Sequence, residues 1–362
     1  MMRLKFFLIF TCLVPILGFA ENQKLSSFVV TLTSDSTLSL IANRYEIVSR
    51  TGDKYLVYVP QDAGDDFLKI VPTALKVQHD ISAELLGVDG KELAGYRTFD
   101  EVEADLFELA NEFSDIAVLE TYGQSRDGRP LYYLRVSDNV VTREFGEPAL
   151  LINSATHGDE LITVEILMSH LETLLRSYGK DPRITEMVNG AEIFFAPVVN
   201  PDGFSRRSRY AHGVDPNRQF PYPGNETRES VDCIAQLIDL VAEFQFDGTL
   251  DVHAHGQIVM YPWAYKRDLL PLKDRSLFAN LAEEMASSAG YRHGQISRIL
   301  YPAVGSSADY FYWKHNTVAM ALEVARSKVP RSGAREQAIK NTEKLFWSFI
   351  SHFLEPAANQ GS

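Results

Sequence analysis

Two histidines and one glutamate have the residue types and spacing of a catalytic zinc site. Glu160 lies three positions after His157, and both follow an apolar run at 149–154. The candidate third ligand is His253, which ends a second apolar run at 249–253. Two imidazoles and one carboxylate leave a fourth position on zinc for water, whose pKa falls to about 7. A bare His-x-x-Glu motif also arises by chance, so its context decides.

Strands must position these side chains. Apolar runs alternate with helical patterns, which is typical of a largely parallel sheet covered on both faces. We therefore predict an α/β fold with a mixed, largely parallel central sheet, preceded by a small α/β N-terminal domain. Ligands at the ends of buried strands open into a crevice, where such folds place their sites. The predicted central strands lie at 149–154, 193–199, 249–253, 258–263 and 318–324.

The first part of the chain forms a separate pattern. Residues 26–85 suggest a small α/β unit with a hairpin turn at 51–53 and a helix over 65–77, which Pro72 weakens. Three glycines in 86–95 indicate a linker. We expect a small domain and linker in 21–95 and a catalytic domain in 96–362. The catalytic domain begins with a capping box, Thr98 to Glu101, ahead of a helix ending near Phe113.

Residues 1–20 have the layout of a secretory signal peptide. Arg3 and Lys5 precede an apolar run, and Gly18 and Ala20 are small residues at the cleavage position. The run of 14 residues at 6–19 is shorter than a membrane span of about 20. We therefore expect a secreted or periplasmic protein with no membrane span after signal removal.

Charge and cysteine content exclude several classes. Loss of Arg3 and Lys5 takes the net charge from −13 to −15, which argues against nucleic acid or anionic membranes as partners. Cys12 leaves with the signal, so Cys233 cannot form an internal disulfide. Its helical, apolar setting indicates a buried structural thiol.

Short motifs then follow one another in a defined order. They are GQSRDGRP at 123–130, HGDE at 157–160, NPDG at 200–203, GVDPNR at 213–218, DVH at 251–253, YPAVGSSADYFY at 301–312 and LE at 322–323. In this order they resemble the zinc carboxypeptidase family that includes carboxypeptidases A and B. The resemblance covers residues 96–355. It implies a peptide substrate and one Zn²⁺ per chain, held by His157, Glu160 and His253.

The resemblance also implies the remaining roles. Glu323 matches the catalytic carboxylate that takes a proton from water and returns it to the leaving amine. Asn217 and Arg218 match the pair that grips the terminal carboxylate of the substrate, and Tyr301 matches the tyrosine that covers it. Without the resemblance, Glu323 would be interpreted as an ordinary strand-end glutamate in a surface ion pair.

A further arginine should polarise the scissile carbonyl. Arg206, Arg207 and Arg209 are candidates, and we favour Arg209 because it lies a few residues before the GVD motif, with the other two expected to be solvated. Ala308 matches the position whose residue type, in this family, goes with the substrate side chain that the enzyme prefers. It carries no negative charge, so it does not support strict specificity for Lys or Arg.

Two positions depart from the digestive enzymes of this family. Asp159 replaces an arginine that is frequent at this position. The HGDE motif resembles more closely that of the murein-peptide amidases of the same family. His255 replaces a tyrosine, and we expect it to line the cleft because the ligand set is already complete. Asp251 is expected in a supporting role at most.

Alternatives remain open at this point. A cell-wall peptidase acting on peptidoglycan stem peptides and an acylamino-acid deacylase could share the fold. An inactive binding module is less favoured because all three ligands and the base are present. Residues 21–95 could be an inhibitory prosegment, with Lys91 as a cleavage point, or a permanent accessory domain.

Overall fold

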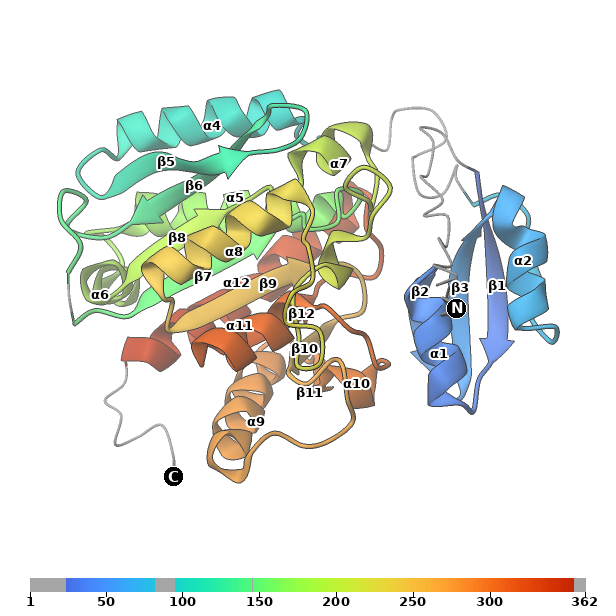
Figure 1. Cartoon of the computed structure of the whole chain (residues 1–362). Coiled ribbons are helices and arrows are strands. Elements are labelled where there is room, and N and C mark those ends of the chain that lie inside the picture. Colours follow the sequence, from blue (N-terminus) through green and yellow to red (C-terminus); the bar gives the residue numbers. More distant parts are fainter. Residues whose placement is uncertain (1–23, 82–94, 145, 355–362) are drawn as a thin grey trace, which may run out of the picture.

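The computed structural model describes residues 24–81, 95–144 and 146–354. The predicted signal peptide and most of the predicted linker lie outside the described residues. Figure 1 shows a large body built around one sheet and a small body at the N-terminal end. The described helices include none with the length and apolar character needed to cross a bilayer.

The large sheet has eight strands in the order β11-β10-β12-β9-β7-β8-β6-β5. Strands β12, β9, β7 and β8 are parallel neighbours, whereas β5 and β6 join the sheet in antiparallel fashion and β10 is antiparallel to β12. The predicted mixed α/β fold is therefore confirmed. The strands are β5 (Ala117–Gln124), β6 (Pro130–Val136), β7 (Ala149–Ser154), β8 (Glu192–Ala196), β9 (Gly248–His253), β10 (Ile258–Tyr261), β11 (Arg292–Gln295) and β12 (Val318–Glu323).

Helices cover both faces of this sheet. In Figure 1, α8 and α11 lie in front of the strands, and α5 and α12 lie behind them. The capping box at Thr98 begins α4 as predicted, because its hydroxyl accepts from Glu101 N and the Glu101 carboxylate accepts from Thr98 N. The helices are α4 (Phe99–Glu112), α5 (Leu161–Ser177), α6 (Pro182–Gly190), α7 (Pro201–Arg206), η2 (Pro216–Arg218), α8 (Asp232–Phe244), α9 (Leu272–Ser287), α10 (Ile296–Ile299), α11 (Ser307–His315) and α12 (Ser332–Leu354).

Central strands β7 and β9 are buried along their whole length. Each has parallel partners on both sides, which explains the apolar run of β7; β9 is equally buried but also carries the polar residues Asp251 and His253. Two predicted strands were too long. β8 and β10 end at Ala196 and Tyr261, each immediately before a proline that lacks the N–H donor a central strand needs. Cys233 is buried in α8, as expected.

The small body is a four-stranded antiparallel sheet in the order β2-β3-β1-β4. The predicted helix over 65–77 is wrong in its second half. The helix stops at Ile70, two residues before Pro72, and residues 75–78 form an edge strand. The elements are β1 (Leu25–Thr31), α1 (Asp35–Ala42), β2 (Glu46–Thr51), β3 (Lys54–Pro60), η1 (Gln61–Ala63), α2 (Gly64–Ile70) and β4 (Leu75–Gln78).

The small body contacts the large one through β2 and the first residue of α1. Asp35 accepts two hydrogen bonds from the Arg267 guanidinium, both 2.9 Å long. Arg50 donates to the carbonyl of Leu300 at 3.0 Å. Tyr301 packs against the small body's own apolar core. These contacts bring β2 to the open end of the large sheet, where β7, β9 and β12 end.

Candidate metal centre

Three predicted ligands meet at the carboxyl ends of β7 and β9. His157 lies on the loop after β7, Glu160 directly precedes α5, and His253 is the last residue of β9. His157 Nδ1 lies 2.8 Å from Glu160 Oε1, and His253 Nδ1 lies 3.2 Å from Glu160 Oε2. All three side chains are buried and offer ligand atoms within 4.8 Å of one another.

The loop that carries His157 and Glu160 requires a glycine between them. A Cβ on Gly158 would overlap the backbone of Gly203 in the NPDG motif. Asn200 fixes that neighbouring segment, because its side chain accepts from Gly203 N at 2.9 Å. Close packing of this loop against α7 therefore sets the ligand positions.

Aspartates support both imidazoles on their outer side. Asp215 Oδ1 lies 3.1 Å from His157 Nε2, and Asp251 Oδ2 lies 3.0 Å from His253 Nε2. Such carboxylates orient a ligating imidazole and leave its other nitrogen for a metal. The supporting role considered for Asp251 fits this position. The sequence reasoning gave Asp215 no role of its own, and its place two residues before Asn217 in the GVDPNR motif was the available signal.

The donor set fits zinc. Burial would raise the pKa of Glu160, but the facing imidazoles of His157 and His253 hold it well below its usual range. Two imidazole Nδ1 atoms and a carboxylate thus face one another, with supporting acids behind them. This is the arrangement that a zinc ion with three protein ligands requires.

Glu323 lies beside this group at the end of β12. Its strand pairs with β9 so that Glu323 is level with His253. Its Oε2 atom is buried and has no hydrogen-bond partner among the described residues. Burial, and next the charge of Glu160, raise the pKa of Glu323 to about 8. A bound cation would oppose this rise. The alternative of a strand-end glutamate in a surface ion pair does not match this environment.

Of the three candidate arginines, Arg209 contacts the metal group. Its Nη1 lies 3.2 Å from His157 Nδ1, and Nε and Nη2 donate to Asp215 Oδ2 at 3.1 and 2.8 Å. Arg206 and Arg207 are half-buried, so the expectation that they are solvated holds only in part. Arg206 pairs with Asp127 at 2.6 Å, and Arg207 donates to the carbonyl of Arg97 at 3.1 Å, because both pack against neighbouring loops.

Asn217, Arg218 and Tyr301 line the same cleft. Arg218 Nη2 lies 3.4 Å from the Tyr301 hydroxyl, and Asn217 Oδ1 accepts from Ser307 N at 3.0 Å. Ser307 begins α11, so this helix fixes the Asn217 amide. Ala308, the next residue, is buried in α11 and is absent from the cleft lining. The structure therefore does not bring Ala308 to the cleft surface.

His255 is a further residue of the cleft, and Lys328 lies behind its lining. His255 lines the cleft and stands apart from the ligand group, in line with the expectation. Burial, and next the charge of Lys328, lower the pKa of His255. Lys328 was missed by the sequence reasoning, and it forms a 2.7 Å ion pair with Asp159, the residue between the ligands.

The small body fills part of this cleft. Glu46, Ile47 and Val48 of β2 are among the lining residues. A register shift between Ile47 and the residue after Val48 makes a bulge at this point of β2. Bulges re-aim side chains and are common beside functional sites.

A second group of possible metal ligands is already neutralised by a cation. Asp127, Asp202 and His212 also lie within ligand distance of one another, but Arg129 pairs with both aspartates at 3.1 and 2.8 Å. That cluster is an ion-pair network.

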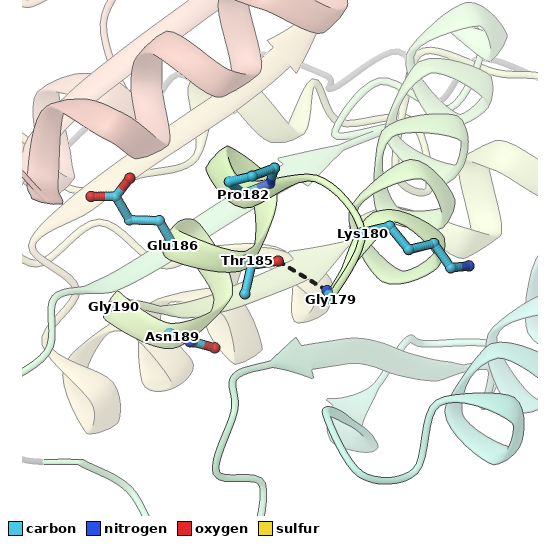
Figure 2. Close-up of a pocket in the computed structure, with 7 residues that line it drawn as sticks. All are labelled: Gly179, Lys180, Pro182, Thr185, Glu186, Asn189 and Gly190. Carbon is cyan, nitrogen blue, oxygen red and sulfur yellow. Dashed lines mark hydrogen bonds between the residues drawn. The ribbon is translucent and has the colours of Figure 1, made fainter.

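A hollow lined by α6 and the turn before it, shown in Figure 2, is distant from the strand ends. The Thr185 hydroxyl there already accepts from Gly179 N at 2.9 Å, and the Lys180 and Glu186 side chains point away from one another. Neither feature resembles a catalytic group.

Comparisons with known proteins agree with the geometry. The sequence model of a family described as zinc carboxypeptidase matches residues 102–347. Mouse carboxypeptidase A4 is 26% identical over 253 residues, covering 60% of this chain and 59% of the relative. Bovine carboxypeptidase A1 is 28% identical over 255 residues, covering 60% of each. The chain thus spans about 60% of the length of these curated relatives.

Solved structures share the fold. The carboxypeptidase A from Helicoverpa armigera superposes with a TM-score of 0.74 at 20% identity, covering 93% of this chain and 98% of that one. Thrombin activatable fibrinolysis inhibitor superposes with a TM-score of 0.70 at 17% identity, covering 92% and 98%. Both alignments extend over the small body as well as the large one.

Proposed function

The chain belongs to the zinc carboxypeptidase family, and we propose that it hydrolyses the C-terminal peptide bond of peptides with one Zn²⁺ held by His157, Glu160 and His253. The observation that carries this proposal is the buried, unpartnered Oε2 of Glu323 beside the ligand group. When bound, the zinc ion would supply a Lewis acid that makes water acidic and polarises the scissile carbonyl.

Arg218, Asn217 and Tyr301 bind the C-terminal end of the substrate. Arg218 binds the terminal carboxylate of the substrate through its guanidinium, and the Asn217 amide donates to the same group. The Tyr301 hydroxyl, 3.4 Å from Arg218 Nη2, covers that end of the cleft. These contacts orient the last residue and exclude water around it.

Proton transfer falls to Glu323. Its Oε2 takes a proton from the attacking water and returns it to the nitrogen of the leaving amino acid. Arg209 faces the carbonyl oxygen, where negative charge develops. Asp215 holds both Arg209 and His157, so charge stabilisation and ligand orientation depend on one carboxylate.

A paired substrate assay tests this function. Zinc-loaded protein is incubated with N-acylated dipeptides that carry either a free or an amidated C-terminus, and with purified muropeptides. We expect release of the last residue only from peptides with a free carboxylate. Cleavage of muropeptides alone would point to the cell-wall alternative, and the carboxypeptidase relatives make peptides the favoured substrate.

We further propose that residues 21–95 keep the enzyme latent. The support is the position of Glu46, Ile47 and Val48 in the cleft lining. A substrate would compete with these side chains for space beside Arg209. Export, with residues 1–20 as the signal, is part of the same proposal, since latency is useful for an enzyme that is activated by proteolysis outside the cell.

A further inference from the structure

Lys328 is a buried cation directly behind the cleft residue Glu46, and the proposed reaction leaves it unused. It is 3% exposed and lies five residues beyond β12. Its carbonyl accepts from Ile162 N at 3.0 Å, which fixes its backbone against the first turn of α5. Its ammonium pairs with Asp159 at 2.7 Å and with Glu46. A lysine held this way has a defined direction and two carboxylate partners.

One of those partners comes from outside the catalytic body. Glu46 belongs to β2 of the small body, and its Oε1 contacts Lys328 while lying 3.8 Å from Arg209 Nη1. Two cations of the large body therefore converge on one oxygen of an inserted carboxylate. Burial would raise the pKa of Glu46, but the charges of Lys328 and Arg209 hold it below its usual value, so the group is anionic.

The place of this carboxylate relative to a bound peptide follows from its neighbours. Arg218, the proposed anchor of the terminal carboxylate, contacts Asn217 and Tyr301. Lys328 contacts neither of these; its partners are Glu46 and Asp159, the latter directly before the ligand Glu160. Arg218 adjoins the ligand group through Asn217, whose Nδ2 lies 3.0 Å from His253 Nε2. Lys328 adjoins it through Asp159, so the group lies between two cationic positions. A peptide anchored at Arg218 would carry the residue before the scissile bond toward Lys328.

We propose that Lys328 binds an acidic side chain on the penultimate residue of the substrate, and that Glu46 occupies this position in the uncleaved chain. The proposal rests on the proposed function, because it takes the peptide direction from Arg218. Asp159 neutralises Lys328 when the position is empty. A glutamate in the substrate would replace Glu46 on both cations.

Binding to the full zinc-loaded chain tests this. The variant Asp35→Asn/Glu46→Gln removes the ion pairs of the small body with Arg267 and Lys328, and faster zinc removal by a chelator than in the native chain verifies that the cleft is open. Glu323→Gln is added to prevent turnover. Calorimetry then compares acetyl-Ala-Glu-Phe with acetyl-Ala-Gln-Phe. We expect the glutamate peptide to bind about tenfold more tightly, the range of a charge-assisted hydrogen bond.

Two further variants assign the preference to Lys328. Asp159→Asn/Lys328→Gln leaves no buried unpaired charge and should reduce the ratio of affinities to about one. Lys328→Arg keeps the cation and should keep the preference. Equal affinity for the two peptides in the opened cleft, or no binding of either, overturns the proposal. A preference for the glutamate peptide that remains in Asp159→Asn/Lys328→Gln also overturns the proposal.

Turnover separates this proposal from the proposed function. With Glu323 intact, the opened variant should hydrolyse the glutamate peptide with about tenfold higher kcat/KM. Hydrolysis of both peptides at one rate, with equal affinities, rejects the Lys328 proposal and leaves the carboxypeptidase function standing. Selective binding without hydrolysis of either peptide rejects the function and supports the binding position.

Discussion

The Nδ1 atoms of His157 and His253 lie 3.2 Å apart, and the carboxylate of Glu160 contacts both. Parallel pairing of β7 with β9 produces this meeting, because both strands end at the same edge of the sheet. Two facing ring nitrogens and an anion form a compact site for a divalent cation.

Removing one of these nitrogens should remove the metal. We expect His253→Ala to bind less than one tenth of the zinc that the native chain retains after gel filtration, because two protein ligands remain of three. His255→Ala is the matched control, since it lies two residues on, lines the cleft and is outside the ligand group. Equal zinc content in the two variants, measured by atomic emission, would contradict the ligand assignment.

Arg218 should contribute to substrate binding rather than to the chemical step. Replacing it with methionine removes a charged partner of the substrate carboxylate, a loss of about 2 kcal/mol or roughly thirtyfold. We expect this mainly as a higher KM, with a smaller effect on kcat. Arg206→Met is the control, because that guanidinium pairs with Asp127. A lower kcat at unchanged KM in the Arg218 variant would show that the arginine acts on the reaction itself.

Cleavage of the linker should activate the enzyme. A protease cut after Lys91 frees the segment that carries Glu46, Ile47 and Val48, which now competes with substrate from within the chain. A tethered segment acts at an effective concentration near millimolar, so we expect kcat/KM to rise roughly tenfold or more. Activity that is unchanged after complete cleavage would show that residues 21–95 are an accessory domain.

His170 should make stability depend on pH. It is buried between α5 and α12, with Nε2 3.0 Å from the Thr342 hydroxyl, and burial lowers its pKa to about 3. The unfolded chain binds a proton near pH 6.5 and the folded chain does not. The unfolding free energy should therefore fall by up to about 1.4 kcal/mol per pH unit as the pH drops below 6.5.

Denaturant unfolding from pH 7.5 to 5 measures this dependence. His170→Gln serves as the comparison, because glutamine can keep a hydrogen bond to Thr342 and does not titrate. The difference in unfolding free energy between the native and variant chains should become smaller as the pH falls. A difference in unfolding free energy that stays constant would mean that His170 takes up a proton as readily in the folded chain as in the unfolded one.

The fold and the metal group could be predicted because their signals are local. Buried strands that lead into His157 and His253 could be recognised from their local sequence, and the Thr98 capping box marks a helix start. The error at 65–77 came from following helical periodicity past Pro72, where the backbone cannot continue.

The contacts around Lys328 could not be predicted. Its partners Glu46 and Asp159 come from distant segments, and one belongs to the other sheet. No spacing in the sequence relates them. Arg206 and Arg207 show the same limit, since whether an arginine is solvated depends on which loop packs beside it.

The central claim is that Glu323 moves the proton at a metal held by His157, Glu160 and His253. Zinc content and turnover of Glu323→Gln, measured beside the native chain on one peptide, test it most directly. We predict full zinc content and a loss of turnover of roughly 10² to 10⁴-fold, the contribution of a general acid–base group. Turnover within a few fold of the native chain, with zinc in place, would contradict the account.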